Sequence, residues 1–139
     1  MENAGNDPKM RKLLTFMTIA ALAALLLPLA AGCGGETPTS AARTFMQHLN
    51  NREFGQAYDM LASSSPLKKI PRNRFINNAE ASTPKGAVVA GFTVTSESVN
   101  GGRATVRWKG TRKAPGTPDD PQNGSWTLNQ EDGHWKLQP

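Results

Sequence analysis

The side chain with the most distinctive chemistry in this 139-residue sequence is its single cysteine, Cys33. A lone thiol can be acylated, oxidised or left free, but it cannot form a disulfide within its own chain. The residues directly before it are Leu29-Ala30-Ala31-Gly32, an apolar stretch covers 13–27, and Lys9, Arg11 and Lys12 precede that stretch. A basic region, an apolar region and a small-residue cleavage site, in this order, predict an export signal.

The segment ending at Cys33 resembles the lipobox of bacterial lipoproteins, although Ala30 stands where that motif usually has Leu. The resemblance implies that the Cys33 thiol receives a diacylglycerol, as in palmitate-bearing lipoproteins, and becomes the mature N-terminus. Residues 1–32 would then be a lipoprotein signal peptide and residues 33–37 a short tether. The alternatives are an ordinary secretory signal, a free or intermolecularly paired thiol, and an uncleaved transmembrane helix over 13–31. In both membrane-bound cases the rest of the chain lies on the extracytoplasmic side of the cell membrane, because positive charges stay inside.

The mature region, residues 33–139, has the size of one domain and a mild excess of positive charge. Removing the leader takes away three basic and two acidic residues, so the formal net charge falls from +5 to +4. This excess suits a protein that faces an anionic membrane surface or wall polymer. The basic residues are too few and too dispersed to predict a nucleic-acid binder.

Three helices are predicted in the first half of the mature region. Thr37 is a capping residue and Pro38 suits the first helical position, so the first helix begins there and ends at Asn50-Asn51. Apolar residues recur at helical spacing in the first two helices and more weakly over 72–81. These residues are Ala42, Phe45, Met46 and Leu49, then Phe54, Ala57, Tyr58 and Leu61, and finally Phe75, Ile76 and Ala79.

After Ala87 the apolar period changes to two residues, which predicts strands. Asp132-Gly133 is a two-residue turn that sets Leu128 opposite Leu137. The proline-rich stretch 112–121 is predicted to be a projecting loop. Four strands are expected, one containing Phe92 and Val94, and the others over 104–109, 125–130 and 134–137.

The turn between the first two strands decides which faces their apolar residues occupy. A three-residue turn over Asn100–Gly102 keeps the apolar residues on one face and pairs Val94 with Trp108 and Ser96 with Val106. The helices must then cover one face of a four-stranded antiparallel sheet. This arrangement is an α+β domain.

Two helical runs and the closing hairpin carry a family resemblance. The runs are Ser40–Leu49 and Phe54–Leu61, and the hairpin holds Trp126-Thr127-Leu128 and Glu131–Leu137. Together they resemble small bacterial lipoproteins with a nuclear transport factor 2-like (cystatin-like) domain of uncharacterised function. The resemblance implies that residues 38–139 pack three helices on a curved sheet, often around a conical pocket. The superfamily also includes isomerases, dehydratases and polyketide cyclases, which place Asp, His or Tyr inside the cone.

Few side chains are candidates for catalysis. Tyr58 lies on the inward stripe of the second helix, and its neighbour Asp59 points about 100° away. An acid–base site needs a second group within hydrogen-bond reach, so we expect Tyr58 to be a core residue. His48 and His134 are far apart in the sequence, and nothing groups carboxylates or the thiol with them. We therefore predict no metal site and no cofactor.

The three tryptophans, Trp108, Trp126 and Trp135, all fall on the predicted inner face of the sheet. With Tyr58 they are the candidate residues of a ligand pocket. The alternative is that they pack against the phenylalanines of the helices. We favour packing, because tryptophans supply the main apolar mass of so small a core.

The basic residues of the mature region form two sets. One set lies in and after the loop before the third helix and consists of Lys68, Lys69, Arg72 and Arg74. The other lies on the outer face of the second strand and its extension and consists of Arg103, Arg107, Lys109, Arg112 and Lys113. The second set is a candidate contact for lipid head groups or wall polymer. The alternative is a solvated face that keeps the sheet soluble.

From these observations we expect a membrane-anchored, extracytoplasmic lipoprotein whose domain is a non-catalytic ligand-binding or interaction module. Its partners would be the membrane, through the lipid anchor, and an envelope protein, a wall polymer or a small apolar ligand. One alternative is a small isomerase- or dehydratase-like enzyme that uses the cone pocket. Another is an envelope structural protein that uses its basic face.

Overall fold

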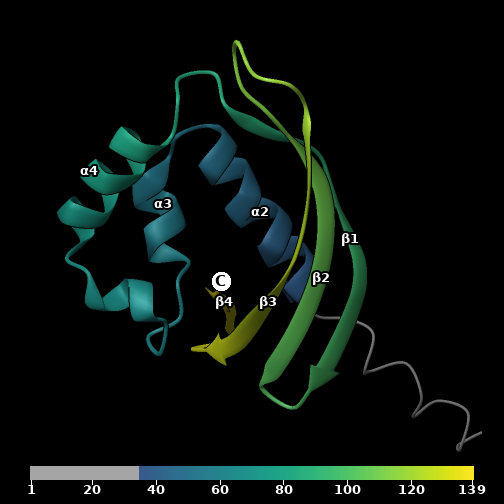
Figure 1. The fold of residues 1–139 in the computed structure, drawn as a ribbon. Coiled ribbons are helices and arrows are strands. Elements are labelled where there is room, and N and C mark those ends of the chain that lie inside the picture. Colours follow the sequence, from purple (N-terminus) through teal and green to yellow (C-terminus); the bar gives the residue numbers. More distant parts are fainter. Residues whose placement is uncertain (1–34) are drawn as a thin grey trace, which may run out of the picture. The chain divides into compact units, whose positions relative to one another are not determined.

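Within residues 35–139, three α-helices precede a four-stranded antiparallel sheet and cover one of its faces (Figure 1). The computed structural model describes these residues. Residues 1–34 lie outside the described residues, and with them the predicted signal peptide and Cys33. The elements are α2 (Pro38–Asn50), α3 (Phe54–Asp59), α4 (Arg72–Ser82), β1 (Val88–Asn100), β2 (Arg103–Lys113), β3 (Asp120–Glu131) and β4 (His134–Gln138). This order confirms the predicted α+β class.

Helix α2 begins where the sequence predicts, because Thr37 and Pro38 start it together. The Thr37 side chain accepts a hydrogen bond from the Ser40 backbone N–H at 3.1 Å, and the Ser40 hydroxyl accepts one from the Thr37 N–H at 2.9 Å. The Glu97 carboxylate of β1 also accepts from the Thr39 N–H at 2.9 Å and from its hydroxyl at 2.6 Å. A carboxylate is stabilised at a helix N-terminus, so these bonds tie the first turn of α2 to β1.

A sharp reversal at Arg52, whose φ is 60°, leads from α2 into α3. After α3 the chain forms a 3₁₀ turn, Pro66–Lys69, which leads into α4. Helix α4 confirms the weak third helix. Its least exposed residues are Phe75, Ile76 and Ala79, as predicted, and its other residues are exposed. Among residues 35–139 the structure contains no helix with both the length and the apolar character to cross a membrane.

The β1–β2 hairpin turns over two residues, Gly101 and Gly102, and not over the three that we predicted. Asn100 pairs directly with Arg103, which leaves only the two glycines in the turn. Gly101 adopts a φ of 58°, a value that glycine reaches without steric cost. A two-residue turn with this backbone matches the natural twist of the strands.

A β-bulge corrects the register that this shorter turn would impose. Next to the turn, Ser96 pairs with Arg107 and not with Val106, so that part of our prediction is wrong. One extra residue in β1 between Val94 and Ser96 then restores the predicted pairing of Val94 with Trp108. The bulge therefore returns the apolar residues of β1 to the inner face of the sheet.

The second hairpin follows the prediction, with Leu128 opposite Leu137. Asp132 and Gly133 both have positive φ, 51° and 80°, as a tight hairpin turn of this type requires. The predicted loop 112–121 is shorter than expected.

Strands β2 and β3 extend into that stretch, and their ladder continues to the pairs Thr111–Pro121 and Arg112–Asp120. Proline has no backbone N–H to donate to a neighbouring strand. Pro121 is tolerated because it is the second residue of β3, and β4 pairs only with the far end of that strand.

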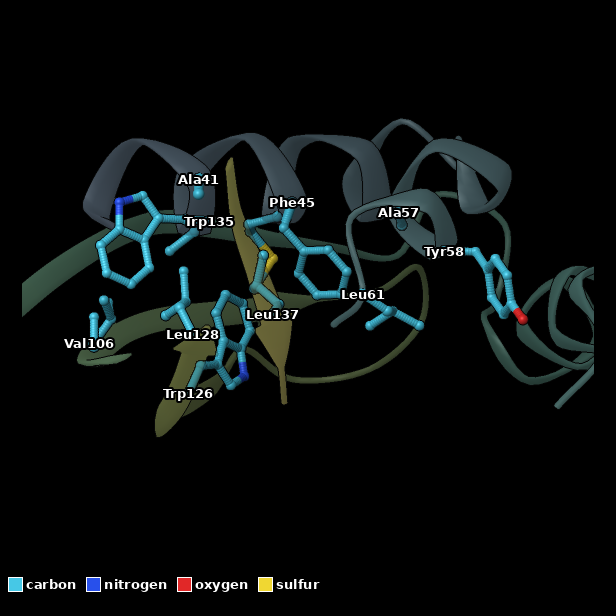
Figure 2. Packing of buried hydrophobic residues seen from close by; sticks show 13 residues of the cluster. Ala41, Phe45, Ala57, Tyr58, Leu61, Val106, Trp126, Leu128, Trp135 and Leu137 are labelled. Carbon is cyan, nitrogen blue, oxygen red and sulfur yellow. The ribbon is translucent and has the colours of Figure 1, made fainter. Parts of the chain in front are cut away.

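The core lies between α2, α3 and the inner face of the sheet, and Trp126 of β3 is its largest aromatic contact with α2 (Figure 2). The ring of Phe45 from α2 meets the Trp126 ring edge-on, at 5.4 Å and 88°. Phe92 stacks on Trp126 from β1 at 5.7 Å. Leu128 and Leu137 are fully buried beside it. The space around Trp126 is therefore filled by side chains.

Replacing Trp126 with alanine removes the side chain that joins α2 to the sheet. The Trp126→Ala variant is expected to lose about 3–5 kcal/mol of unfolding free energy, because the cavity cannot collapse around so many aromatic neighbours. Chemical denaturation followed by circular dichroism measures this loss. Val99→Ala is the control, because Val99 is 51% exposed and its truncation should change stability by less than about 0.5 kcal/mol. Equal losses in the two variants would contradict the central role of Trp126.

Candidate functional site

Backbone carbonyls engage the hydroxyl of Tyr58, the candidate catalytic residue. This hydroxyl donates to the carbonyl oxygen of Ile70 at 2.8 Å and lies 3.1 Å from that of Lys68. The Lys68 ammonium lies 4.2 Å from the centre of the Tyr58 ring, and Phe75 of α4 packs against that ring at 5.3 Å. Within residues 35–139 no titratable side chain hydrogen-bonds the hydroxyl. The side chain thus joins α3 to the 3₁₀ turn and to α4.

Asp59, the neighbour of Tyr58, faces away from it and binds α4. Two nitrogens of the Arg72 guanidinium donate to the two Asp59 carboxylate oxygens, at 3.1 and 3.2 Å. This hydrogen bonding holds the pKa of Asp59 below its usual value and raises the pKa of Arg72. Both groups are more than half exposed, so the pair is a surface link between two helices.

The three tryptophans lie on the inner face of the sheet but do not form one group. Trp108 and Trp126 touch, with ring centres 5.2 Å apart, while Trp135 stands on β4. The indole of Trp108 covers Gly124 so closely that a Cβ there would lie 3.0 Å from the ring. The Trp108 indole N–H is buried and has no hydrogen-bond partner in the described part of the chain. None of the tryptophans, nor Tyr58, lines the clefts described below.

The histidines are separated and pair with different carboxylates. His48 Nδ1 lies 2.6 Å from Glu53 Oε2, and His134 Nδ1 lies 3.7 Å from Glu36 Oε2. Residues 35–139 contain no group of three or more His, Cys, Asp or Glu side chains that could hold a metal ion.

The outer face of β2 carries cations without acidic neighbours. Arg103, Arg107 and Lys109 alternate along the strand and are exposed. Their cross-strand partners on β1 and β3 are all neutral and polar, namely Asn100 and Asn129, Ser96 and Ser125, and Thr93 and Asn123. Thr105, between the cations, is flanked by Ser98 and Thr127. A continuous positive and hydrogen-bonding surface results, which we call the basic face.

Arg112 and Lys113 lie apart from this face. Lys113 pairs with Asp119 of the following loop at 3.1 Å. Arg112 lines a cleft of about 180 Å³ together with Met46, Leu49 and Phe54 of the helices. The even-numbered residues of β2 point inward, because its ladder with β3 runs without a bulge. This alternation was visible in the sequence and could have placed Arg112 on the inner side.

A second cleft adjoins the first between α2 and β1. It has a volume of about 600 Å³, is open to solvent, and shares the side chains of Met46, Asn50 and Val89 with the smaller cleft. A third, of about 390 Å³, lies beside β2 and β3 around Gly110 and Asn123. The sequence did not indicate these clefts, because each is formed by elements far apart along the chain.

No protein-family model and no curated protein matches the sequence. Solved structures match the fold. A SEC-C motif containing protein from Rhodopseudomonas palustris aligns at 14% identity with a TM-score of 0.60, over 74% of this chain and 76% of that one. A similar protein from Psychrobacter arcticus aligns at 14% identity and 0.55, over 76% and 60%.

An NTF2-like protein with a cystatin-like fold from Novosphingobium aromaticivorans aligns over 88% of this chain and 84% of that one, at 11% identity and a TM-score of 0.54. Residues 35–139 therefore adopt the nuclear transport factor 2-like fold that the sequence resemblance implied. At such identities the likeness establishes the fold alone, so function must be argued from the residues of this chain.

Removing only the Tyr58 hydroxyl tests its role as a link. The Tyr58→Phe variant is expected to lose about 1–2 kcal/mol of unfolding free energy, because the Ile70 carbonyl, in the segment that leads into α4, loses its donor. Urea denaturation measures the loss, and amide hydrogen exchange should show weaker protection in α4 than in the sheet. Ser125→Ala, which removes an exposed hydroxyl, is the control. Unchanged stability in Tyr58→Phe would show that the hydroxyl contributes nothing to the fold.

Proposed function

We propose that this chain is a non-catalytic interaction module, held on the extracytoplasmic side of the cell membrane by a lipid on Cys33, that docks onto anionic phospholipid head groups. The observation that carries the proposal is the basic face of β2, where three cations have only neutral polar neighbours. The filled space around Trp126 and the engaged Tyr58 hydroxyl support a role without catalysis.

The spacing of the cations suits an extended anionic surface better than a small anion. Residues of one strand face are separated by about 6.7 Å, so Arg103 and Lys109 stand roughly 20 Å apart. Each cation would meet a different head group, and hydroxyl and amide side chains between them can donate to phosphate oxygens. Arg107 and Lys109, about 6.7 Å apart, lie within the Debye length of about 8–10 Å at physiological salt and reinforce each other, while Arg103 stands roughly 13 Å from Arg107.

The tether supports the choice of the membrane over a distant polymer. Four residues separate Cys33 from Pro38, so the start of α2 would lie within roughly 18 Å of the acylated cysteine. The β1–β2 hairpin lies at the same end of the domain, where Glu97 binds the first turn of α2 (Figure 1). Arg103 opens β2 at this hairpin, so the nearest available anions are the head groups of the same membrane.

The anchor is tested first. We expect Cys33→Ser to abolish incorporation of radiolabelled palmitate and to move the protein from the membrane fraction to the soluble exported fraction. Gly32→Ala keeps a small residue at the cleavage site and should remain labelled. Labelled palmitate in Cys33→Ser, or none in the unaltered chain, would contradict the anchor.

The basic face is tested without the lipid, on residues 33–139 with Cys33→Ser, since residues 35–139 form a compact unit with their own core. Neutralising Arg103, Arg107 and Lys109 together with glutamine is expected to weaken binding to phosphatidylglycerol vesicles roughly 100-fold, at about 1 kcal/mol for each cation. Vesicle co-sedimentation measures this affinity.

A second triple variant, with the same loss of positive charge elsewhere on the domain, shows whether vesicle binding depends on the basic face or on the net charge. Lys69, Arg74 and Lys85 are exposed and lie outside the basic face, and their neutralisation should leave vesicle binding within about threefold of the unaltered domain. Equal losses in the two triple variants would contradict a specific face. Retention of vesicle binding, with loss of binding to isolated wall polymer, would replace the lipid partner by the polymer.

A further inference from the structure

A second, chemically different site lies on the opposite side of the sheet. The 180 Å³ cleft opens between the end of α2, the start of α3 and the start of β1. Its lining is almost entirely apolar, with Leu49, Phe54 and Val89 among the side chains, and Arg112 is the only charged residue in it. It shares no residue with the basic face, so it stands independently of the proposed function.

Hydrogen bonds and close packing hold the walls of this cleft in place. The Asn50 side-chain amide donates to the Val89 carbonyl at 3.0 Å and accepts from the Val89 N–H at 2.8 Å, as a neighbouring strand would. The Arg52 guanidinium donates to the Thr83 carbonyl at 2.9 Å and lies 5.4 Å from the centre of the Phe54 ring. The cleft is therefore shaped by fixed elements and does not depend on a loose loop.

Arg112 is exposed and brings a positive charge to the edge of this apolar space. Its guanidinium makes no ion pair and no side-chain hydrogen bond within residues 35–139. Its cross-strand partner Asp120 is the nearest acidic residue on the ladder, but no ion pair joins the two side chains in the described part of the chain, and one Asp120 carboxylate oxygen accepts from the Gln122 amide at 2.6 Å. Five guanidinium donors are thus available to an acceptor that enters the cleft.

We infer that this cleft binds a small apolar carboxylate, with the ring or short chain among Leu49, Phe54 and Val89 and the carboxylate on Arg112. A guanidinium recognises a carboxylate through two parallel hydrogen bonds, which uncharged ligands cannot reproduce. The volume agrees with this class, since a protein cavity of about 150 Å³ holds one benzene ring. Both this cleft and the adjoining one are open to solvent, and a longer chain would extend past Met46 from the first into the second.

Benzoate and benzyl alcohol are the matched probes, because they share the ring and differ in the carboxylate. We expect benzoate, titrated into the ¹⁵N-labelled domain, to shift the amide signals of Leu49, Phe54 and Val89 and to bind at least tenfold more tightly than benzyl alcohol. Arg112→Gln should remove this preference. Lys113→Gln removes the adjacent cation outside the cleft and should leave the benzoate affinity within twofold.

Ala87→Phe provides a second variant, because it fills the cleft while Arg112 stays in place, and it should abolish the binding of both probes. The amide spectrum of each variant shows whether it is folded. The inference is overturned if the two probes bind equally, if Arg112→Gln and Lys113→Gln weaken benzoate alike, or if the shifted amides lie on the basic face. If the domain binds benzoate but not vesicles, the proposed function fails and this site stands. If it binds vesicles but not benzoate, this site fails and the proposed function stands.

Discussion

The structure depends on one contact, the edge-on packing of Phe45 in α2 against Trp126 in β3. This contact closes the inner face of the sheet, because Trp126 also carries Phe92 of β1 and Trp108 of β2 around its ring. A domain of about 100 residues has little other apolar mass, and residues 35–139 contain no cysteine that could stabilise it through a disulfide. Using the aromatic residues for packing fills the space around Trp126, so ligands and partners must be met at the outer surface or in the open clefts between α2 and β1.

The curvature of β1 makes this packing possible. Two irregularities add residues to β1 relative to β2, one between Val94 and Ser96 and one between Ala90 and Thr93. At the second, Gly110 of β2 has no Cβ, and a Cβ there would lie 2.7 Å from the Val89 side chain. The strand bends towards the helices at this point. The same bend brings Val89 beside the end of α2, where the apolar cleft forms.

Charges are divided between the two sides of the domain. The carboxylates are used in the fold: Glu97 binds the first turn of α2, Asp59 binds Arg72, and Glu131 accepts from the Ser63 N–H at 3.0 Å. Within residues 35–139, the three cations of the basic face make no ion pair with a carboxylate. The mild net positive charge of the sequence therefore becomes a local surface on one face of the sheet, where a polyanion can approach without meeting acidic side chains.

Local signals decided much of what could be predicted. Thr37 and Pro38 place the start of α2, the 3.6-residue stripes place the helices, and Asp132-Gly133 sets Leu128 opposite Leu137, because each signal acts over a few neighbouring residues. The extent of β2 and β3 and the β1 bulges could not be predicted this way. They arise where strands and helices far apart in sequence must fit together. The signals around Cys33 are also local, and they predict an anchor that lies outside the described residues.

The sequence by itself determined the α+β order, the apolar faces and the cationic alternation along β2, because propensity and periodicity are properties of short segments. Only the tertiary structure decided that the space around Trp126 is filled, that the Tyr58 hydroxyl is bound to backbone carbonyls, and that Arg112 faces an apolar cleft away from the other cations. Each of these features joins segments that are far apart in the sequence. They are therefore decided by how the helices and strands pack together, and a short stretch of sequence does not contain that information.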